Sequence, residues 1–284
     1  MHIAYVTHNG QPTAILSTDG GQIWTKPQIP AGSPQDLSGI YQAGDLSAMA
    51  QSAQPIDSGA LNWLPPIVPA TKILAIGLNY KDHAKEQKSA LPTQPLIFIK
   101  LTSSVIPHGH PINWDPAITQ AVDYEAELAV IIGKKARYVT EAEALDYVFG
   151  YTCANDVTAR DLQAGDGQWA RVKGMDTFCP LGPWIVTRDA VRDPQAIGIH
   201  SMVNGEVRQN SNTSEMVFSV RQIIAYLSRA FTLQPGDVIL TGTPAGVGNG
   251  RDPKVFLAEG DEVVVELDGI GRLENRCHLL PHQG

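Results

Sequence analysis

The chain has 284 residues, with 29 acidic and 21 basic side chains and a formal net charge of −8. This acidic balance argues against a nucleic-acid surface, which normally shows clustered basic residues. No apolar run approaches the about 20 residues that a membrane-spanning helix needs. The N-terminus has no secretory signal pattern, and the three cysteines are far apart, which is typical of reduced thiols in a cytoplasmic protein.

The first part of the chain is predicted to form strands and turns. Residues 3–7 and 13–17 are apolar runs on either side of Asn9-Gly10, a dipeptide that favours tight hairpins because both of its residues adopt positive φ. Four prolines then fall within residues 54–69, which is typical of a linker. We therefore expect a small β-rich N-terminal domain over residues 1–68 and a catalytic domain over residues 69–284.

Short strands separated by Gly, Pro and Asp turns dominate the second part. The clearest helix is expected over residues 219–228, whose apolar side chains share one stripe. Other helices are expected over residues 81–90 and 142–148. Strands are expected over residues 72–76, 96–100, 126–132, 184–187, 197–203, 238–240, 255–257 and 262–267. The pattern predicts an α+β fold that is mostly β rather than a βαβ array.

Two glutamates near the start of the predicted strand 126–132 form the first candidate site. On a strand Glu125 and Glu127 point to the same face, and two adjacent carboxylates stay ionised only beside a cation. Asp156 follows another apolar stretch and could complete a set of three oxygen ligands, which suits Mg²⁺ or Mn²⁺ and sometimes Ca²⁺. The alternative is a solvated strand face with basic neighbours.

A histidine and a glutamate on the predicted helix 81–90 form the second candidate. His83 and Glu86 are three residues apart, so a helix places them on one face, where the carboxylate can orient the imidazole as a general base. A casual surface contact explains the same spacing.

Two further segments could face a ligand. Lys173 stands next to a glycine and could neutralise an anionic substrate, although a surface turn explains it almost as well. The segment 241–248 is rich in glycine but lacks the Gly-Lys-Ser/Thr ending of a phosphate loop, so it indicates only close approach of backbone to a ligand.

Taken together and in order, these stretches resemble the fumarylacetoacetate hydrolase family, in its 2-hydroxyhepta-2,4-diene-1,7-dioate isomerase and acylpyruvase-like branch. Six ordered motifs carry the resemblance, which covers about three quarters of the chain. The motifs are GLNYKDHAKE at 77–86, DYEAEL at 123–128, NDVTARDLQ at 155–163, KGMDTF at 173–178, VNGE at 203–206 and TGTPAGVG at 241–248.

The resemblance implies a mixed β-roll catalytic domain, here preceded by a small N-terminal domain, in a homodimer. It implies that Glu125, Glu127 and Asp156 hold one divalent ion, usually Mg²⁺ or Mn²⁺. The implied catalytic residues are His83, Glu86 and Lys173, and the implied substrate-binding residues are Tyr80, Arg160, Gln163 and Thr243.

The implied activity is metal-dependent cleavage of a C–C bond in an acylpyruvate-type 2,4-dioxo acid, with a pyruvate enolate leaving on the metal. The same site could decarboxylate an oxaloacetate-type acid, or act as an isomerase or tautomerase of a 2-hydroxy-diene-dioate. In each of these reactions the expected partner is a small 2-oxo acid, and neither nucleic acid nor membrane is expected to take part. A more distant alternative is a non-catalytic binding protein stabilised by the metal.

Overall fold

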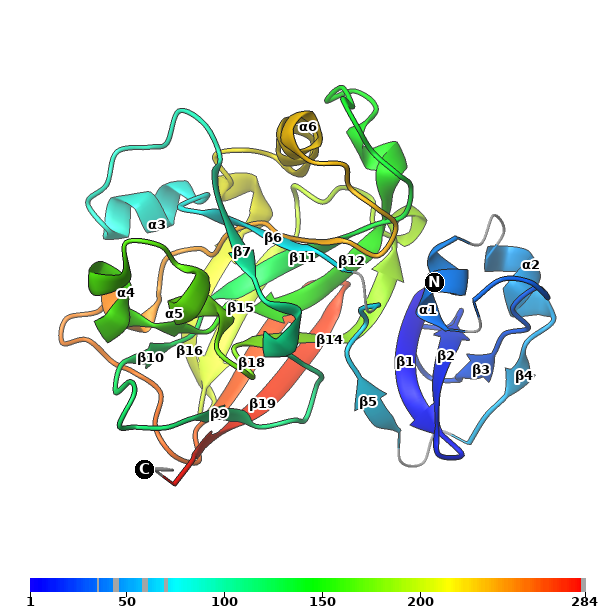
Figure 1. Cartoon of the computed structure of the whole chain (residues 1–284), viewed down its shortest axis with the longest axis horizontal. Coiled ribbons are helices and arrows are strands. Elements are labelled where there is room, and N and C mark those ends of the chain that lie inside the picture. The colour runs from blue at the N-terminus through cyan, green and yellow to red at the C-terminus, as the bar shows by residue number, and fades with distance from the viewer. Residues whose placement is uncertain (35, 43–45, 58–60, 69–70, 282–284) are drawn as a thin grey trace.

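The computed structural model describes residues 1–34, 36–42, 46–57, 61–68 and 71–281. Within this part of the chain the fold is mainly β, with a twelve-stranded sheet, a five-stranded sheet and a two-stranded ribbon, to which short helices are added (Figure 1). This arrangement confirms the predicted α+β class with a mostly β body.

The large sheet runs through both parts of the molecule. In spatial order its strands are β4 (Gln54–Pro55), β3 (Thr25–Lys26), β2 (Gln11–Ser17), β1 (His2–His8), β14 (Cys179–Thr187), β12 (Val148–Asn155), β11 (Ala126–Ile132), β17 (Val238–Leu240), β6 (Ile73–Gly77) and β7 (Leu96–Lys100), with β5 (Asn62–Leu64) beside β1 and β8 (Val105–Ile106) beside β14. Strand β11 lies inside the sheet, whereas β7 lies at its edge.

The other sheets complete the body. The five-stranded sheet has the order β16 (Glu206–Asn212), β15 (Gly198–Val203), β18 (Glu262–Leu267), β19 (Gly271–Leu279) and β9 (Ile112–Trp114). The ribbon pairs β10 (Val122–Asp123) with β13 (Thr158–Ala159).

Strand β11 shows why its sequence is almost continuously apolar. Leu128 and Val130 face a core cluster that includes residues of β15, β18 and α6, while Ala129 and Ile131 face a second cluster that includes residues of α1. All seven residues of β11 are buried, because the strand has packing partners on both faces. Glu125 and Glu127, at the N-terminal end of this strand, are therefore placed in a low-dielectric interior.

The helices are short and lie around the sheets. They are α1 (Leu37–Tyr41), α2 (Leu46–Gln51), α3 (Lys81–Glu86), α4 (Arg160–Asp166), α5 (Ala170–Gly174) and α6 (Val220–Ala230), with 3₁₀ turns at Thr102–Ser104, Ala144–Tyr147, Arg188–Ala190, Thr213–Glu215 and Gly248–Gly250. None of the described helices is long and apolar enough to cross a membrane.

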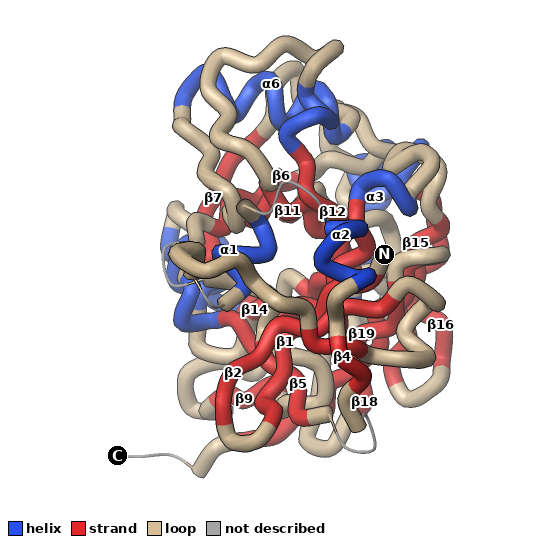
Figure 2. The backbone as a smooth tube through the Cα atoms, turned by 90° about the vertical axis from the view of Figure 1, so that its right-hand side faces the viewer, coloured by secondary structure: helices blue, strands red, loops and turns tan. Residues whose placement is uncertain are grey.

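The N-terminal hairpin forms where the sequence predicts it. Strands β1 and β2 are joined by Asn9 and Gly10, whose φ angles of 51° and 73° are the positive values that such a turn requires. Strand β1 also pairs with β14 through Ile3 and Ile185, so the N-terminal strands continue the sheet of the larger part (Figure 2). A domain boundary at residue 68 stays a prediction.

Two predicted elements are wrong. Residues 142–148 form only the 3₁₀ turn Ala144–Tyr147, because Val148 is already extended at the start of β12. Residues 255–257 form no strand: the Val255 amide bonds to Gly248 and the Leu257 amide bonds to Val122, so each is held by a different segment rather than by a ladder.

Candidate active site

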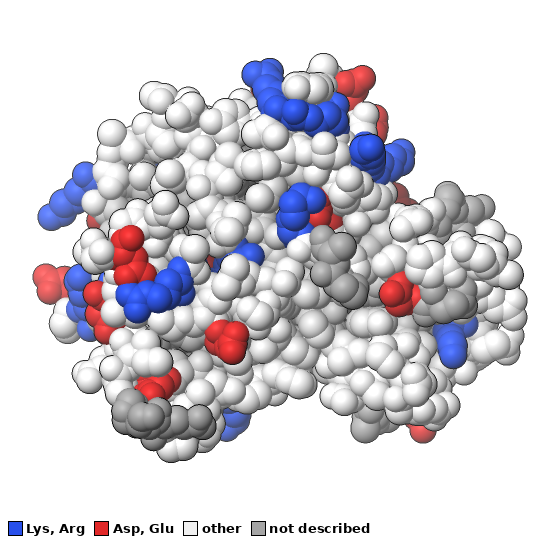
Figure 3. All heavy atoms as spheres, in the orientation of Figure 1, with Lys and Arg blue, Asp and Glu red and all other residues white. Residues whose placement is uncertain are grey.

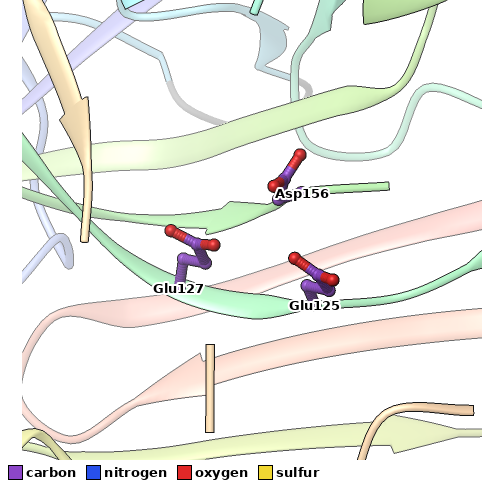
Figure 4. A group of neighbouring side chains, drawn as sticks. All are labelled: Glu125, Glu127 and Asp156. Atoms are coloured by element: carbon purple, nitrogen blue, oxygen red, sulfur yellow. The ribbon is translucent and has the colours of Figure 1, made fainter. Parts of the chain in front are cut away.

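Three buried carboxylates converge at the paired ends of β11 and β12. Glu127 is the second residue of β11, Glu125 immediately precedes that strand, and Asp156 immediately follows β12. The Asp156 amide donates to the Glu125 carbonyl at 2.9 Å, which fixes the two backbones side by side. One carboxylate oxygen from each residue lies within 4.8 Å of the others, and the side chains point toward one another (Figure 4).

Lys173 on α5 bonds to two members of this carboxylate cluster. Its ammonium donates to Glu125 at 2.9 Å, to Asp156 at 2.6 Å and to the Thr158 hydroxyl at 2.8 Å. An ammonium has three N–H donors, so each of them has a partner. Lys173 therefore supplies fixed positive charge at the site and has no spare donor.

A second buried lysine, Lys100, was not predicted. It ends the edge strand β7, and its ammonium donates to Asp156 at 2.5 Å and to the Phe178 carbonyl at 2.7 Å. The only sequence signal for this role is a lysine at the end of the apolar run Leu96–Ile99. A lysine in that position is buried at acceptable cost only if it is paired and hydrogen-bonded.

Replacing Lys100 by Met should destabilise the metal-free protein by about 3 kcal/mol, because the buried Asp156 loses one of its two cations. Urea unfolding measures this change. Lys72→Met is the matched control: Lys72 is also 2.5 Å from an aspartate, Asp237, but its side chain is 39% exposed. The control should cost less than about 1 kcal/mol. Equal losses in the two variants would contradict the buried-pair account.

Arg160 links the carboxylate cluster to a glycine-rich loop. Its guanidinium donates to Asp123 at 2.9 Å, to the Gln163 side chain at 3.2 Å and also to Glu125. Asp123 in turn accepts the amides of Gly248 at 2.7 Å and Asn249 at 3.0 Å. Asp123, which positions Arg160, was not predicted, although it opens the motif that contains both glutamates.

The charges of this buried network fit a divalent cation. Burial by itself raises the pKa of Glu125, but Lys173 and then Arg160 outweigh it and hold that pKa at about 2. Burial, followed by the nearby Asp156 and Glu125 carboxylates, raises the pKa of Glu127 well above its ordinary value. Glu127 is therefore the acid that lacks a cation of its own, and oxygen donors of this kind suit Mg²⁺ or Mn²⁺.

The segment 241–248 uses its backbone amides to bind carboxylates of the chain itself. Gly242 donates to Glu127 at 2.7 Å, and Gly246 donates to Glu86 at 2.8 Å. Both glycines have positive φ, and a Cβ on Gly246 would lie 2.1 Å from the Arg208 carbonyl oxygen. In the structure the backbone of this segment contacts acidic groups of the site, and its close approach to a ligand stays a prediction.

The predicted histidine–glutamate pair is present on α3. His83 Nδ1 lies 3.0 Å from a Glu86 carboxylate oxygen, and the Gly246 amide holds the other oxygen. The helix ends at Glu86 rather than at residue 90, since Lys88 has a φ of 52°. With Nδ1 oriented by Glu86, Nε2 is the ring nitrogen left to face a ligand, and the described residues offer it no hydrogen-bond partner.

A cavity of about 330 Å³ brings these groups together. It is lined by Ile76, Gly77, Leu78, His83, Gln87, Ser89, Leu96, Phe98, Glu125, Glu127, Arg160, Gln163, Trp169, Lys173, Thr243 and Asn249. Of the four residues expected to bind substrate, the structure places Arg160, Gln163 and Thr243 in this lining. Thr243 is additionally fixed by the Gln209 side chain, which donates to its hydroxyl at 2.7 Å.

Tyr80 is the exception among the predicted site residues. Its side chain is 0% exposed, packs in the core and does not line the cavity. It directly precedes α3, and its backbone forms an isolated bridge with Met216, so the side chain turns inward. Contact of Tyr80 with substrate therefore stays a prediction that the cavity lining does not support.

Known proteins share both the sequence and the fold. The chain is 44% identical to the mitochondrial oxaloacetate tautomerase FAHD2A of Bos taurus over 94% of this chain and 87% of that protein. The fumarylacetoacetate hydrolase structure from Exiguobacterium antarcticum has a TM-score of 0.88 and 38% identity, covering 99% of this chain and 100% of that one.

A third similar protein was solved with ligands. The structure of maleylpyruvate hydrolase from Sphingobium sp. SYK-6, in complex with manganese(II) and pyruvate, has a TM-score of 0.80 and 29% identity over 99% of this chain and 100% of that one. The family model described as fumarylacetoacetate (FAA) hydrolase C-terminal matches residues 72–278. The chain therefore belongs to the fumarylacetoacetate hydrolase family.

Proposed function

We propose that the protein is a metal-dependent tautomerase of 2-oxo acids of the oxaloacetate type. It would interconvert the keto and enol forms by moving a proton between C3 and the oxygen on C2. One observation carries this proposal: a single cavity is lined by two carboxylates of the cluster that fits a divalent ion, by the fixed charge of Lys173, and by the oriented imidazole of His83.

The residues of the cavity divide into two roles. Arg160, Gln163 and Thr243 present polar groups that can hold the substrate, and His83 accepts a proton. In the forward direction His83 Nε2 would take the C3 proton, the C–H electrons would form the C2–C3 double bond, and the imidazolium would return a proton to the C2 oxygen. Lys173 contributes positive charge that stabilises the oxyanion during this transfer.

Glu125, Glu127 and Asp156 would hold the ion. A bound Mg²⁺ or Mn²⁺ supplies Lewis-acid chemistry at the carbonyl of a chelating 2-oxo acid. The manganese(II) and pyruvate in the similar maleylpyruvate hydrolase support this choice of ion and of ligand class. The name of the bovine relative, an oxaloacetate tautomerase, supports proton transfer as the reaction.

Hydrolytic cleavage of an acylpyruvate, the reaction placed first by the sequence analysis, is the second candidate. The His83–Glu86 pair favours it, because a carboxylate-oriented imidazole can equally take a proton from water. The water oxygen would then attack the distal carbonyl, and the C–C bond would break with its electron pair going to C3. The imidazolium would return the proton to C3, which gives a carboxylic acid and pyruvate.

The test follows oxaloacetate with purified Mg²⁺-loaded enzyme. We expect faster loss of the enol absorbance than with Mg²⁺ alone, with oxaloacetate conserved and no matching release of pyruvate or CO₂. A parallel assay offers an acylpyruvate and measures pyruvate. If enol loss is not accelerated but acylpyruvate is cleaved, the hydrolase reading replaces the tautomerase; release of CO₂ with pyruvate from oxaloacetate would instead identify a decarboxylase.

A further inference from the structure

The cavity has an apolar wall that the proposed proton transfer does not use. Besides the polar groups, its lining includes Leu96 and Phe98 on β7, Trp169 immediately before α5, and Gly77 at the end of β6. A cavity of about 330 Å³ falls in the range that holds drug-sized ligands, so a four-carbon diacid leaves part of it unfilled.

The apolar wall begins next to the catalytic groups. The Phe98 ring lies 5.0 Å from the Lys173 ammonium, and its centroid is 5.4 Å from that of Trp169 in an edge-to-face arrangement. Leu96 is 46% exposed, so the wall reaches the protein surface. A substrate held beside Lys173 and extended away from it would meet first Phe98 and then the indole.

Gly77 makes this packing possible. A Cβ at this position would lie 2.8 Å from the Trp169 ring and 3.1 Å from Leu96, so any side chain here would push the indole out of its place. Leu96, Phe98 and Trp169 also line a second hollow of about 550 Å³, together with Phe231. These three side chains are therefore shared by the two cavities.

The charges of the cavity agree with an uncharged distal group. The basic residues in the lining are Lys173, Arg160 and His83, and each of them is already paired with a carboxylate. A carboxylate placed along the apolar wall would lose water without gaining a cation, whereas an aromatic group would gain contacts. On the outer surface drawn in Figure 3, charged side chains stand in small, separated groups of both signs.

We propose that Leu96, Phe98 and Trp169, packed over Gly77, form a subsite for the apolar end of the substrate. Resting on the proposed tautomerase function, this extends the substrate class to 2-oxo acids that carry an uncharged aromatic or aliphatic group on C3. Phenylpyruvate is the probe, because it undergoes the same keto–enol exchange as oxaloacetate but ends in an aryl ring.

The test compares keto–enol exchange of phenylpyruvate and oxaloacetate by Mg²⁺-loaded wild type, Trp169→Ala and Leu96→Ala. Trp169→Ala should raise KM for phenylpyruvate about tenfold, as expected for one lost aromatic contact, and leave KM for oxaloacetate within about twofold. Leu96→Ala, at a half-exposed position that tolerates truncation, should show the same selectivity with a smaller change. Phe231→Ala is the control, because Phe231 lines only the outer hollow, and both substrates should be unaffected.

Calorimetric titration of phenylpyruvate into the same variants separates the two proposals. If oxaloacetate is not turned over but phenylpyruvate binds and Trp169→Ala weakens that binding about tenfold, the subsite stands and the tautomerase assignment falls. If oxaloacetate is turned over but phenylpyruvate neither binds nor reacts, the subsite is wrong. Equal effects of Trp169→Ala on both substrates would also overturn it.

Discussion

Replacing Glu127 by Gln should remove divalent-metal binding and lower turnover by at least about a hundredfold, while leaving the metal-free protein folded. The substitution keeps an oxygen that can accept the Gly242 amide, so the backbone contact is preserved. It removes the one carboxylate of the cluster that lacks a cation partner among the described residues. A neutral amide is a much weaker ligand for a hard cation than a carboxylate.

Thermal unfolding with and without Mg²⁺ or Mn²⁺ measures this effect. An ion at 100 times its Kd stabilises the wild type by about 2.7 kcal/mol, and this gain should disappear in Glu127→Gln. The metal-free variant should be at least as stable as the wild type, because burial and the neighbouring acids raise the pKa of Glu127 and make its ionised form costly. Glu141→Gln, at an exposed position, is the control and should keep the full response to metal. A metal response that survives in Glu127→Gln would remove this residue from the metal site.

The clustering of the three carboxylates was predictable because their placement follows from local rules. Glu125 and Glu127 are two residues apart, and the period of a strand puts both on one side. Asp156 required one further inference, that the strand before it reaches the same place, and the Ala126–Asn155 pairing of β11 with β12 supplies that contact. His83 and Glu86 likewise needed only the period of a helix.

The supporting groups could not be predicted, because their roles depend on long-range contacts. Lys100 reaches Asp156 across 56 positions of sequence, and Asp123 reaches the loop amides of Gly248 and Asn249 across 125 and 126. Neither contact leaves a periodic or compositional signal. Tyr80 is a similar case. Its place in the motif predicts that it lies near the site, but nothing in the sequence predicts that its ring is buried in the core.

The apolar wall of the cavity could not be predicted from the sequence either. Phe98 is one member of an apolar strand, and Trp169 stands alone in a polar stretch, so the sequence gives no reason to pair them. They meet because β7 contacts α5 at the edge of the large sheet. The proposed substrate preference therefore depends on tertiary packing, whereas the proposed chemistry depends on short motifs.

Replacing His83 by Ala should lower turnover by about 10²- to 10⁴-fold, the usual contribution of a general acid–base group, without changing metal binding. Alanine is the best helix former, so α3 should persist. Glu86→Gln should also lower turnover. Two different oxygens of Glu86 bond to the Gly246 amide and to His83 Nδ1, and the single oxygen of an amide can replace only one of them.

Steady-state kinetics of oxaloacetate ketonisation, measured together with the Mg²⁺-induced rise in Tm, separate a catalytic role from a structural one. A His83→Ala variant with normal turnover would exclude His83 as the proton acceptor. Loss of the Mg²⁺ response together with turnover would instead assign His83 to holding the site together. His200→Ala is the matched control: this histidine lies near Asp268, its side chain is 30% exposed, and it does not line the cavity, so both measurements should stay at wild-type values.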